Sequence, residues 1–197
     1  LNTMSFSSFG LPYTLLQAIS RLGWTTPTPV QSASLGAALQ GRDLLGCAPT
    51  GSGKTLAFAL PVLAHLNRSR GKQPSALVLV PTRELATQVG EVLLSLAQEL
   101  PGRIKVSVVF GGVSINPQMM AMRGGTQVLV ATPGRLLDLV AHNAVKLSEV
   151  SLLVLDEADR LLDLGFADEL NQLLAQLPTP RQHLFFSATF PPAVQTL

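Results

Sequence analysis

The sequence predicts an α/β domain in which a mostly parallel central sheet is covered by helices on both faces. Short, almost continuously apolar runs alternate with stretches of helical spacing from about residue 32 onward, and such runs are typical of parallel strands buried on both sides. The length of 197 residues fits about one domain. The 47% hydrophobic and 13% charged fractions exclude a chain that is disordered throughout.

Six apolar runs are expected to form the strands: 43–47, 76–80, 106–110, 128–131, 152–155 and 183–186. The expected helices between them are 56–66, 85–99, 118–123, 135–141 and 167–176. Residues 1–31 are expected to be an N-terminal lead-in, with helical spacing over 11–22 and a turn cluster at Gly23, Pro27 and Pro29. Residues 32–197 are then the α/β domain itself.

Composition excludes several other classes of protein. The single cysteine, Cys47, excludes a disulfide framework and a cysteine-based zinc site. No apolar run approaches the roughly 20 residues needed to span a bilayer, and no basic residue precedes Arg21, so we expect neither a membrane span nor a secretory leader. A reducing, cytoplasmic setting is the default expectation. The net charge of +2 fits a nucleic-acid partner and an arginine-biased composition equally well.

A phosphate-binding loop follows the first predicted strand. Residues 48–55 read APTGSGKT, which is a strand–P-loop–helix pattern except that Ala48 replaces the usual first glycine. Thr50, Gly51, Ser52 and Gly53 would present backbone N–H groups to phosphates. Lys54 can reach the β and γ phosphates, and the Thr55 hydroxyl can ligate Mg²⁺. The sequence therefore predicts a site for ATP or ADP with Mg²⁺.

An acidic segment follows the fifth predicted strand. Residues 156–159 read DEAD, and carboxylates so close together repel one another unless a cation offsets them. Asp156 is placed to hold Mg²⁺, largely through water. Glu157 is the candidate base that orients an attacking water.

This acidic segment resembles the signature of the DEAD-box RNA helicases, and almost the whole chain resembles the first RecA-like domain of that family. Ala48 is itself the family's residue at its position. The stretch 23–31, GWTTPTPVQ, is similar to the family's adenine-reading Q motif, and Phe6 matches its isolated upstream aromatic residue. The resemblance implies that Gln31 hydrogen-bonds the adenine edge and that Phe6 packs on the ring. Ordinary core packing of Phe6, with Phe9 in its place at the adenine, is the alternative.

Residues 187–189, SAT, resemble the family's motif III. The resemblance implies that Ser187 and Thr189 hydrogen-bond the acidic motif and couple the ATP site to strand separation.

Three further segments resemble the RNA-binding motifs of the family, and each follows a predicted strand. They are PTRELA at 81–86, GG at 111–112 and TPGRL at 132–136. The resemblance implies sequence-tolerant RNA contacts to the backbone by Thr82, Arg83, Gly112, Thr132, Gly134 and Arg135. For Arg83 a local ion pair with Glu84 is the alternative.

The resemblance implies an ATP-dependent RNA helicase whose second RecA-like domain, C-terminal in the same protein, supplies arginine fingers. We therefore expect this chain to be a monomeric ATP-binding half with little turnover of its own. An ATP-gated RNA clamp would need the same residues, and a P-loop NTPase acting on DNA or protein is disfavoured by Gln31 and the RNA motifs. Residues 109–120 and 135–139 resemble bacterial RhlE-type helicases.

Overall fold

The computed structural model of the protein describes residues 4–66 and 71–197. Within these residues a six-stranded sheet has the order β1-β6-β5-β2-β4-β3, and every pairing is parallel. The strands are β1 (Leu44–Cys47), β2 (Ala76–Leu79), β3 (Val106–Val109), β4 (Val128–Ala131), β5 (Leu152–Leu155) and β6 (Gln182–Ser187). The predicted parallel sheet is confirmed, and no predicted strand end is misplaced by more than one residue.

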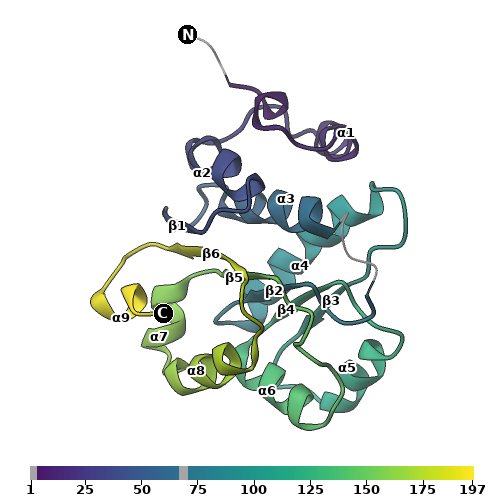
Figure 1. Ribbon diagram of the computed structural model, residues 1–197, viewed down its shortest axis with the longest axis vertical. Helices are drawn as coiled ribbons and strands as arrows, with labels where there is room; N and C mark the ends of the chain where they lie inside the picture. The colour runs from purple at the N-terminus through teal and green to yellow at the C-terminus, as the bar shows by residue number, and fades with distance from the viewer. Residues whose placement is uncertain (1–3, 67–70) are drawn as a thin grey trace.

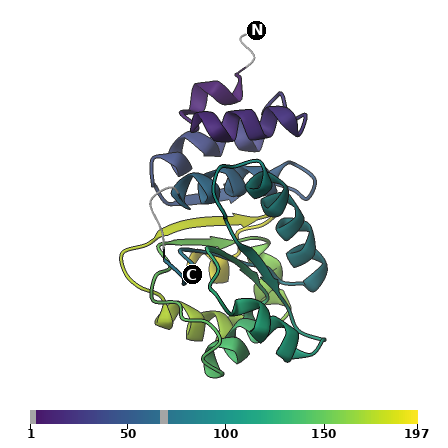
Figure 2. The same cartoon turned by 90° about the vertical axis from the view of Figure 1, so that its right-hand side faces the viewer.

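Helices cover both faces of this sheet (Figures 1 and 2). They are η1 (Phe6–Phe9), α1 (Tyr13–Arg21), α2 (Pro29–Leu39), α3 (Lys54–Leu66), α4 (Arg83–Gln98), α5 (Ile115–Met122), α6 (Pro133–Ala141), α7 (Ala158–Asp163), α8 (Ala167–Gln176) and α9 (Pro192–Gln195). The predicted helices after β1 to β4 begin two or three residues too late. Their first turns hold polar or proline residues, such as those after the N-cap Thr82, which accepts a hydrogen bond from the Leu85 amide. A prediction based on the spacing of apolar residues does not detect such turns.

Strand side chains alternate between two cores. Val78 and Val154 belong to the core under α1 to α4, whereas Leu77 and Leu153 belong to the core that contains α6 and α8. Figure 2 shows the purple and blue N-terminal helices stacked on one side of the sheet and the green helices on the other. The central strands β2, β4 and β5 are buried on both faces and therefore read as continuous apolar runs, whereas the edge strand β1 alternates between half-buried and exposed residues.

Helix α2 was not predicted, and it crosses the expected boundary between residues 31 and 32. Its apolar residues are spread around the helix, so periodicity gave no signal. The signal lay in its first turn, where Pro29 occupies a position favoured for proline and Gln31 Oε1 accepts a hydrogen bond from the Thr28 amide at 2.9 Å. The lead-in is also part of the main core, because Phe6 and Leu15 are buried in the same cluster as α3 and α4.

Among the described residues, no helix is both long and apolar enough to cross a membrane.

Candidate functional site

The candidate site lies along the edge formed by the carboxyl ends of the parallel strands. The sheet order divides this edge into two halves. The phosphate loop, the SAT segment and the acidic segment follow β1, β6 and β5, whereas the three predicted RNA segments follow β2, β4 and β3. Backbone hydrogen bonds continue past the strand ends: Ala48 to Ser187, Asp156 to Leu79, Val80 to Ala131 and Thr132 to Val109, each at 3.0–3.2 Å. The topology therefore places the predicted nucleotide residues beside the predicted RNA residues on one connected edge.

The phosphate loop has the predicted strand–loop–helix context, and α3 begins at Lys54. Gly51 and Gly53 have φ angles of 81° and 92°, which are accessible to glycine at little cost. A Cβ atom at Gly53 would lie 2.7 Å from the side-chain nitrogen Nε2 of Gln31. Glycine at position 53 is therefore required both by backbone conformation and by close approach.

Lys54 is the buried charge of this loop. Its Nζ lies 4.0 Å from Asp156 Oδ1 and has no hydrogen-bond partner among the described residues. The buried Ser52 hydroxyl also lacks one. Unpaired buried polar groups are costly, and a helix N-terminus favours anions. These groups therefore fit the phosphates of a nucleotide.

Asp156 is buried at the end of β5. Burial raises the pKa of its carboxyl to about 6; the Lys54 ammonium opposes this shift and the Glu157 carboxylate adds to it. A bound cation would favour the charged carboxylate. No group of three or more His, Cys, Asp or Glu side chains converges as a metal site in the part of the chain that the structure describes. Thr55 and Asp156 thus fit Mg²⁺ only as partial ligands, which suits an ion that keeps waters and nucleotide phosphates in its shell.

The other two acidic side chains turn to different partners. Glu157 has a left-handed backbone, with φ 53°, and its carboxylate lies 3.6 Å from Arg160. Asp159 Oδ2 accepts hydrogen bonds from the Thr189 amide at 3.0 Å and hydroxyl at 2.8 Å, and the Asp159 amide donates to Ser187 Oγ at 3.0 Å. Burial alone would raise the pKa of Asp159, but its hydrogen bonds outweigh burial and hold the pKa below its usual range. The predicted hydrogen bonds between SAT and the acidic motif are present.

Two cavities adjoin these groups. One of about 440 Å³ is lined by Thr50, Lys54, Glu157 and Asp159, among others. Residues of both the phosphate loop and the acidic segment therefore line the same cavity.

A second cavity, of about 360 Å³, is lined by the Q-motif residues, including Trp24 and Gln31, together with Phe6. Phe6 lines this cavity and is also buried in the core, so its core packing does not exclude a contact with a ligand. Phe9 does not line it, which disfavours the alternative. This cavity fits a flat heterocycle such as adenine.

The Gln31 side chain is already engaged within the protein. Its Nε2 donates to the Gly53 carbonyl at 3.0 Å, and its Oε1 accepts from the Thr28 amide at 2.9 Å. One proton and one lone pair of the amide remain for a ligand. The resemblance implied only an adenine contact, whereas the structure shows that Gln31 also ties the Q motif to the phosphate loop.

The predicted RNA residues fall into two groups by exposure. Gly112 and Arg83 are exposed, while Thr82 and Gly134 are half-buried. Arg83 Nε donates to Glu84 Oε1 at 2.9 Å, so the alternative ion pair is formed. The hydrogen bond from Arg83 lowers the pKa of Glu84. Exposed pairs of this kind are weak, so Arg83 remains available to a phosphate.

Arg135 and Thr132 are buried instead. The Arg135 guanidinium donates to the Val113 carbonyl at 2.7 Å and lies 3.8 Å from Asp138. The RNA contact of Arg135 stays a prediction; in this structure its buried guanidinium ties α6 to the loop after β3. Periodicity could have indicated this, because Arg135 precedes Leu136 and Leu139 on a helix that packs on the core.

Sequence reasoning singled out neither Arg160 nor Leu56, whereas Trp24 lay within the stretch that resembles the Q motif. Arg160 lies three residues after Glu157, a spacing that brings side chains together on a helix. Leu56 lines the cavity of the Q motif, and nothing in its sequence context distinguishes it from a core leucine.

Comparison with known proteins decides the family. The sequence model of the DEAD/DEAH box helicases matches residues 28–197. The chain belongs to the DEAD/DEAH box helicase family. It is 42% identical over 196 residues to DEAD-box ATP-dependent RNA helicase 20 of Oryza sativa and 43% identical over 193 residues to ATP-dependent RNA helicase DeaD of Escherichia coli K12. It is also 42% identical over 197 residues to ATP-dependent RNA helicase dbp2 of Schizosaccharomyces pombe.

These matches cover 98% of this chain but 39%, 30% and 36% of the respective relatives. The chain thus spans about a third of the length of the helicases that it matches.

Proposed function

We propose that this chain is the ATP-binding half of an ATP-dependent RNA helicase. In the whole protein, RNA would stimulate ATP hydrolysis and local RNA duplexes would be unwound. The observation that carries the proposal is the buried Lys54 ammonium, which lies 4.0 Å from the Asp156 carboxylate, lines a cavity and has no hydrogen-bond partner in the described residues. An anionic ligand with a bound cation would satisfy both groups.

Each residue has a stated role in this proposal. Residues 50–53 and Lys54 bind the phosphates, and Thr55 and Asp156 hold Mg²⁺. When bound, Mg²⁺ supplies positive charge that offsets the charge developing on the phosphates. Glu157 orients the attacking water, and its carboxylate lies in the cavity that Lys54 also lines. Phe6 and Gln31 select adenine.

Ser187 and Thr189 position Asp159 and thereby link the acidic segment to the end of β6. Thr82, Arg83, Gly112, Thr132 and Gly134 lie along the half of the edge that we propose for RNA, and Arg135 positions the loop after β3. Contacts of this kind reach the backbone, so binding would be sequence-tolerant and sensitive to salt.

A second RecA-like domain of the same protein would complete the catalytic site. Arginine fingers contribute roughly 10³–10⁵ in turnover where they have been measured, so this half alone should bind nucleotide and hydrolyse it slowly. We further propose a monomeric fragment of a cytoplasmic, RhlE-type enzyme.

The test is calorimetric titration of this chain with ADP and, separately, GDP, both with Mg²⁺. Binding of ADP without GDP supports the phosphate site and the adenine cavity together. Equal binding of both contradicts the adenine role of Gln31 and Phe6 and favours a general P-loop NTPase. Absence of binding contradicts a preformed nucleotide site in this chain.

A further inference from the structure

A basic surface lies at the opposite edge of the sheet, where the strands begin. We call it the amino-edge patch, and it consists of Lys72, Arg103, Lys105, Arg123 and Lys146, which are all exposed. They precede β2, β3, β4 and β5, so the same topology that gathers the candidate site gathers these cations at the far edge. None of them has a carboxylate within 4.0 Å among residues 4–66 and 71–197.

Hydrogen bonds hold the loops of the patch together. Thr126 donates its amide to the Lys72 carbonyl and its hydroxyl to the Lys105 carbonyl, both at 3.0 Å. The Lys105 ammonium donates to the Ala121 carbonyl and, at 3.3 Å, to the Arg123 carbonyl. Gln73 Oε1 accepts from the Lys146 amide at 2.9 Å. The loops that carry the cations are therefore connected by hydrogen bonds and do not stand independently of one another.

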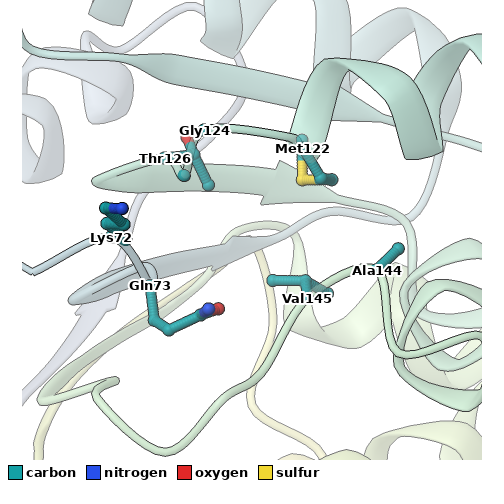
Figure 3. Close-up of a pocket in the computed structure, with 8 residues that line it drawn as sticks. Lys72, Gln73, Met122, Gly124, Thr126, Ala144 and Val145 are labelled. Carbon is teal, nitrogen blue, oxygen red and sulfur yellow. The ribbon is translucent and has the colours of Figure 1, made fainter.

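A pocket of about 190 Å³ adjoins the patch at Lys72 (Figure 3). Met122 and Val145 give it apolar walls, and Lys72 and Gln73 line it as well. The Gln73 amide nitrogen has no protein acceptor in the part of the chain that the structure describes. The Glu149 carboxylate lies beside Gly71, and the five cations of the patch outweigh its single negative charge.

We propose that the amino-edge patch binds a second segment of single-stranded RNA, outside the cleft at the carboxyl edge. The cations contact phosphates, and the pocket accommodates one unstacked base. The bases of a continuous duplex are paired and stacked, so none of them could enter the pocket. The pocket therefore favours single-stranded RNA over a duplex. That the ligand is RNA rests on the proposed function, whereas the surface itself is independent of the nucleotide site.

The test uses this chain, without nucleotide, and measures the affinity for fluorescent oligouridine as a function of salt. The variant combines Lys72→Glu with Arg123→Glu, because neither side chain makes a hydrogen bond or ion pair among the described residues. The matched control combines Arg42→Glu with Gln40→Glu and Ala33→Glu, whose side chains make no hydrogen bond or ion pair among the described residues. It makes the same change in net charge on exposed residues; Arg42 precedes β1, four strand spacings from β4, or about 19 Å.

Two phosphate contacts on a single strand add about 1.4 to the slope of log affinity against log salt, equivalent to about 25-fold in affinity between 1 M and 0.1 M salt. We expect the patch variant to lose at least about tenfold in affinity at 0.1 M salt and about 1.4 in slope, and the control to lose much less. Equal losses in both variants, or no loss in either, would overturn the proposal. Tighter binding of a duplex than of oligouridine would overturn the single-strand assignment.

Two further measurements identify the ligand and the location. If the patch variant loses binding to polyglutamate but keeps its affinity for RNA, the surface binds an acidic protein and the RNA proposal is wrong. In an NMR titration with oligouridine, the amides of Gly124 and Thr126 should shift; shifts confined to Gly112 and Gly134 would overturn it. ADP titrations separate the two proposals. The patch variant should bind ADP as tightly as the unmodified chain does. Absence of ADP binding by the unmodified chain would contradict only the proposed function.

Discussion

Replacing Asp156 with asparagine should stabilise the nucleotide-free domain, although it should also impair Mg²⁺ binding. The folded protein raises the pKa of this carboxyl from 3.8 to about 6, so the native state binds the proton more tightly than the unfolded chain does. Stability is then lost as pH rises from about 4 to about 6. At pH 7 the charged carboxylate costs about 3 kcal/mol, because each tenfold change in proton affinity corresponds to about 1.4 kcal/mol.

Asparagine removes that cost because it is neutral and nearly isosteric. The assay is urea unfolding in EDTA at pH 7 and at pH 4, with Asp163→Asn, an exposed residue of α7, as the control. At pH 7, Asp156→Asn should gain about 3 kcal/mol, or roughly 6–12 °C in melting temperature for a domain of this size. At pH 4 the gain should shrink towards zero, and Asp163→Asn should change stability by less than about 0.5 kcal/mol at either pH.

The reasoning would be refuted if Asp156→Asn were no more stable than the unmodified chain at pH 7. That result would mean that the attraction between Lys54 and Asp156 outweighs the burial of the carboxylate. A gain that does not change with pH would equally contradict titration of Asp156 as its origin.

Four other expectations follow from the geometry. Lys54→Met should weaken ADP binding by about 10- to 100-fold, the value of a charged hydrogen bond; calorimetry measures this, and an unchanged affinity would contradict a phosphate contact. Gln31→Ala should weaken ADP binding and also destabilise the domain by about 1–3 kcal/mol, because it leaves the half-buried Thr28 amide and Gly53 carbonyl unpaired. Loss of ADP binding with unchanged stability would contradict the structural role of Gln31 and leave only its role at the adenine. Arg135→Lys should lower the urea midpoint by more than Arg83→Lys, since only Arg135 is buried, and equal midpoints would contradict its role as a tie. In a two-domain form of the protein, Glu157→Gln should abolish multiple-turnover unwinding; retained function would identify an ATP-gated clamp.

Much of the fold was predictable because its signals are local. Strands such as 152–155 are apolar throughout and end at a polar residue, so burial on both faces and the strand end are both visible in the sequence. The phosphate loop and the acidic segment were predictable because each is a contiguous run that follows a strand.

Features that depend on distant contacts were not predictable in the same way. The bond from Gln31 to the Gly53 carbonyl spans 22 residues, and the sequence suggested only a ligand for that amide. Burial of Arg135 likewise depends on the Val113 carbonyl, again 22 residues away. Helix α2 escaped because small residues such as Ser34 and Gly36 blur the contrast between its faces.

The backbone hydrogen bonds that continue past the strand ends have a mechanical consequence. They join the phosphate loop to the end of β6, and the acidic segment to the end of β2 and onward through β4 to the end of β3. These hydrogen bonds hold the strand ends at fixed distances from one another, so the distance between the proposed nucleotide site and the proposed RNA site is also fixed. Binding at one site then cannot affect the other site by changing this distance. Coupling between the two sites then requires rearrangement of side chains at this edge, such as Glu157 and Arg160, or movement of the whole domain relative to another domain.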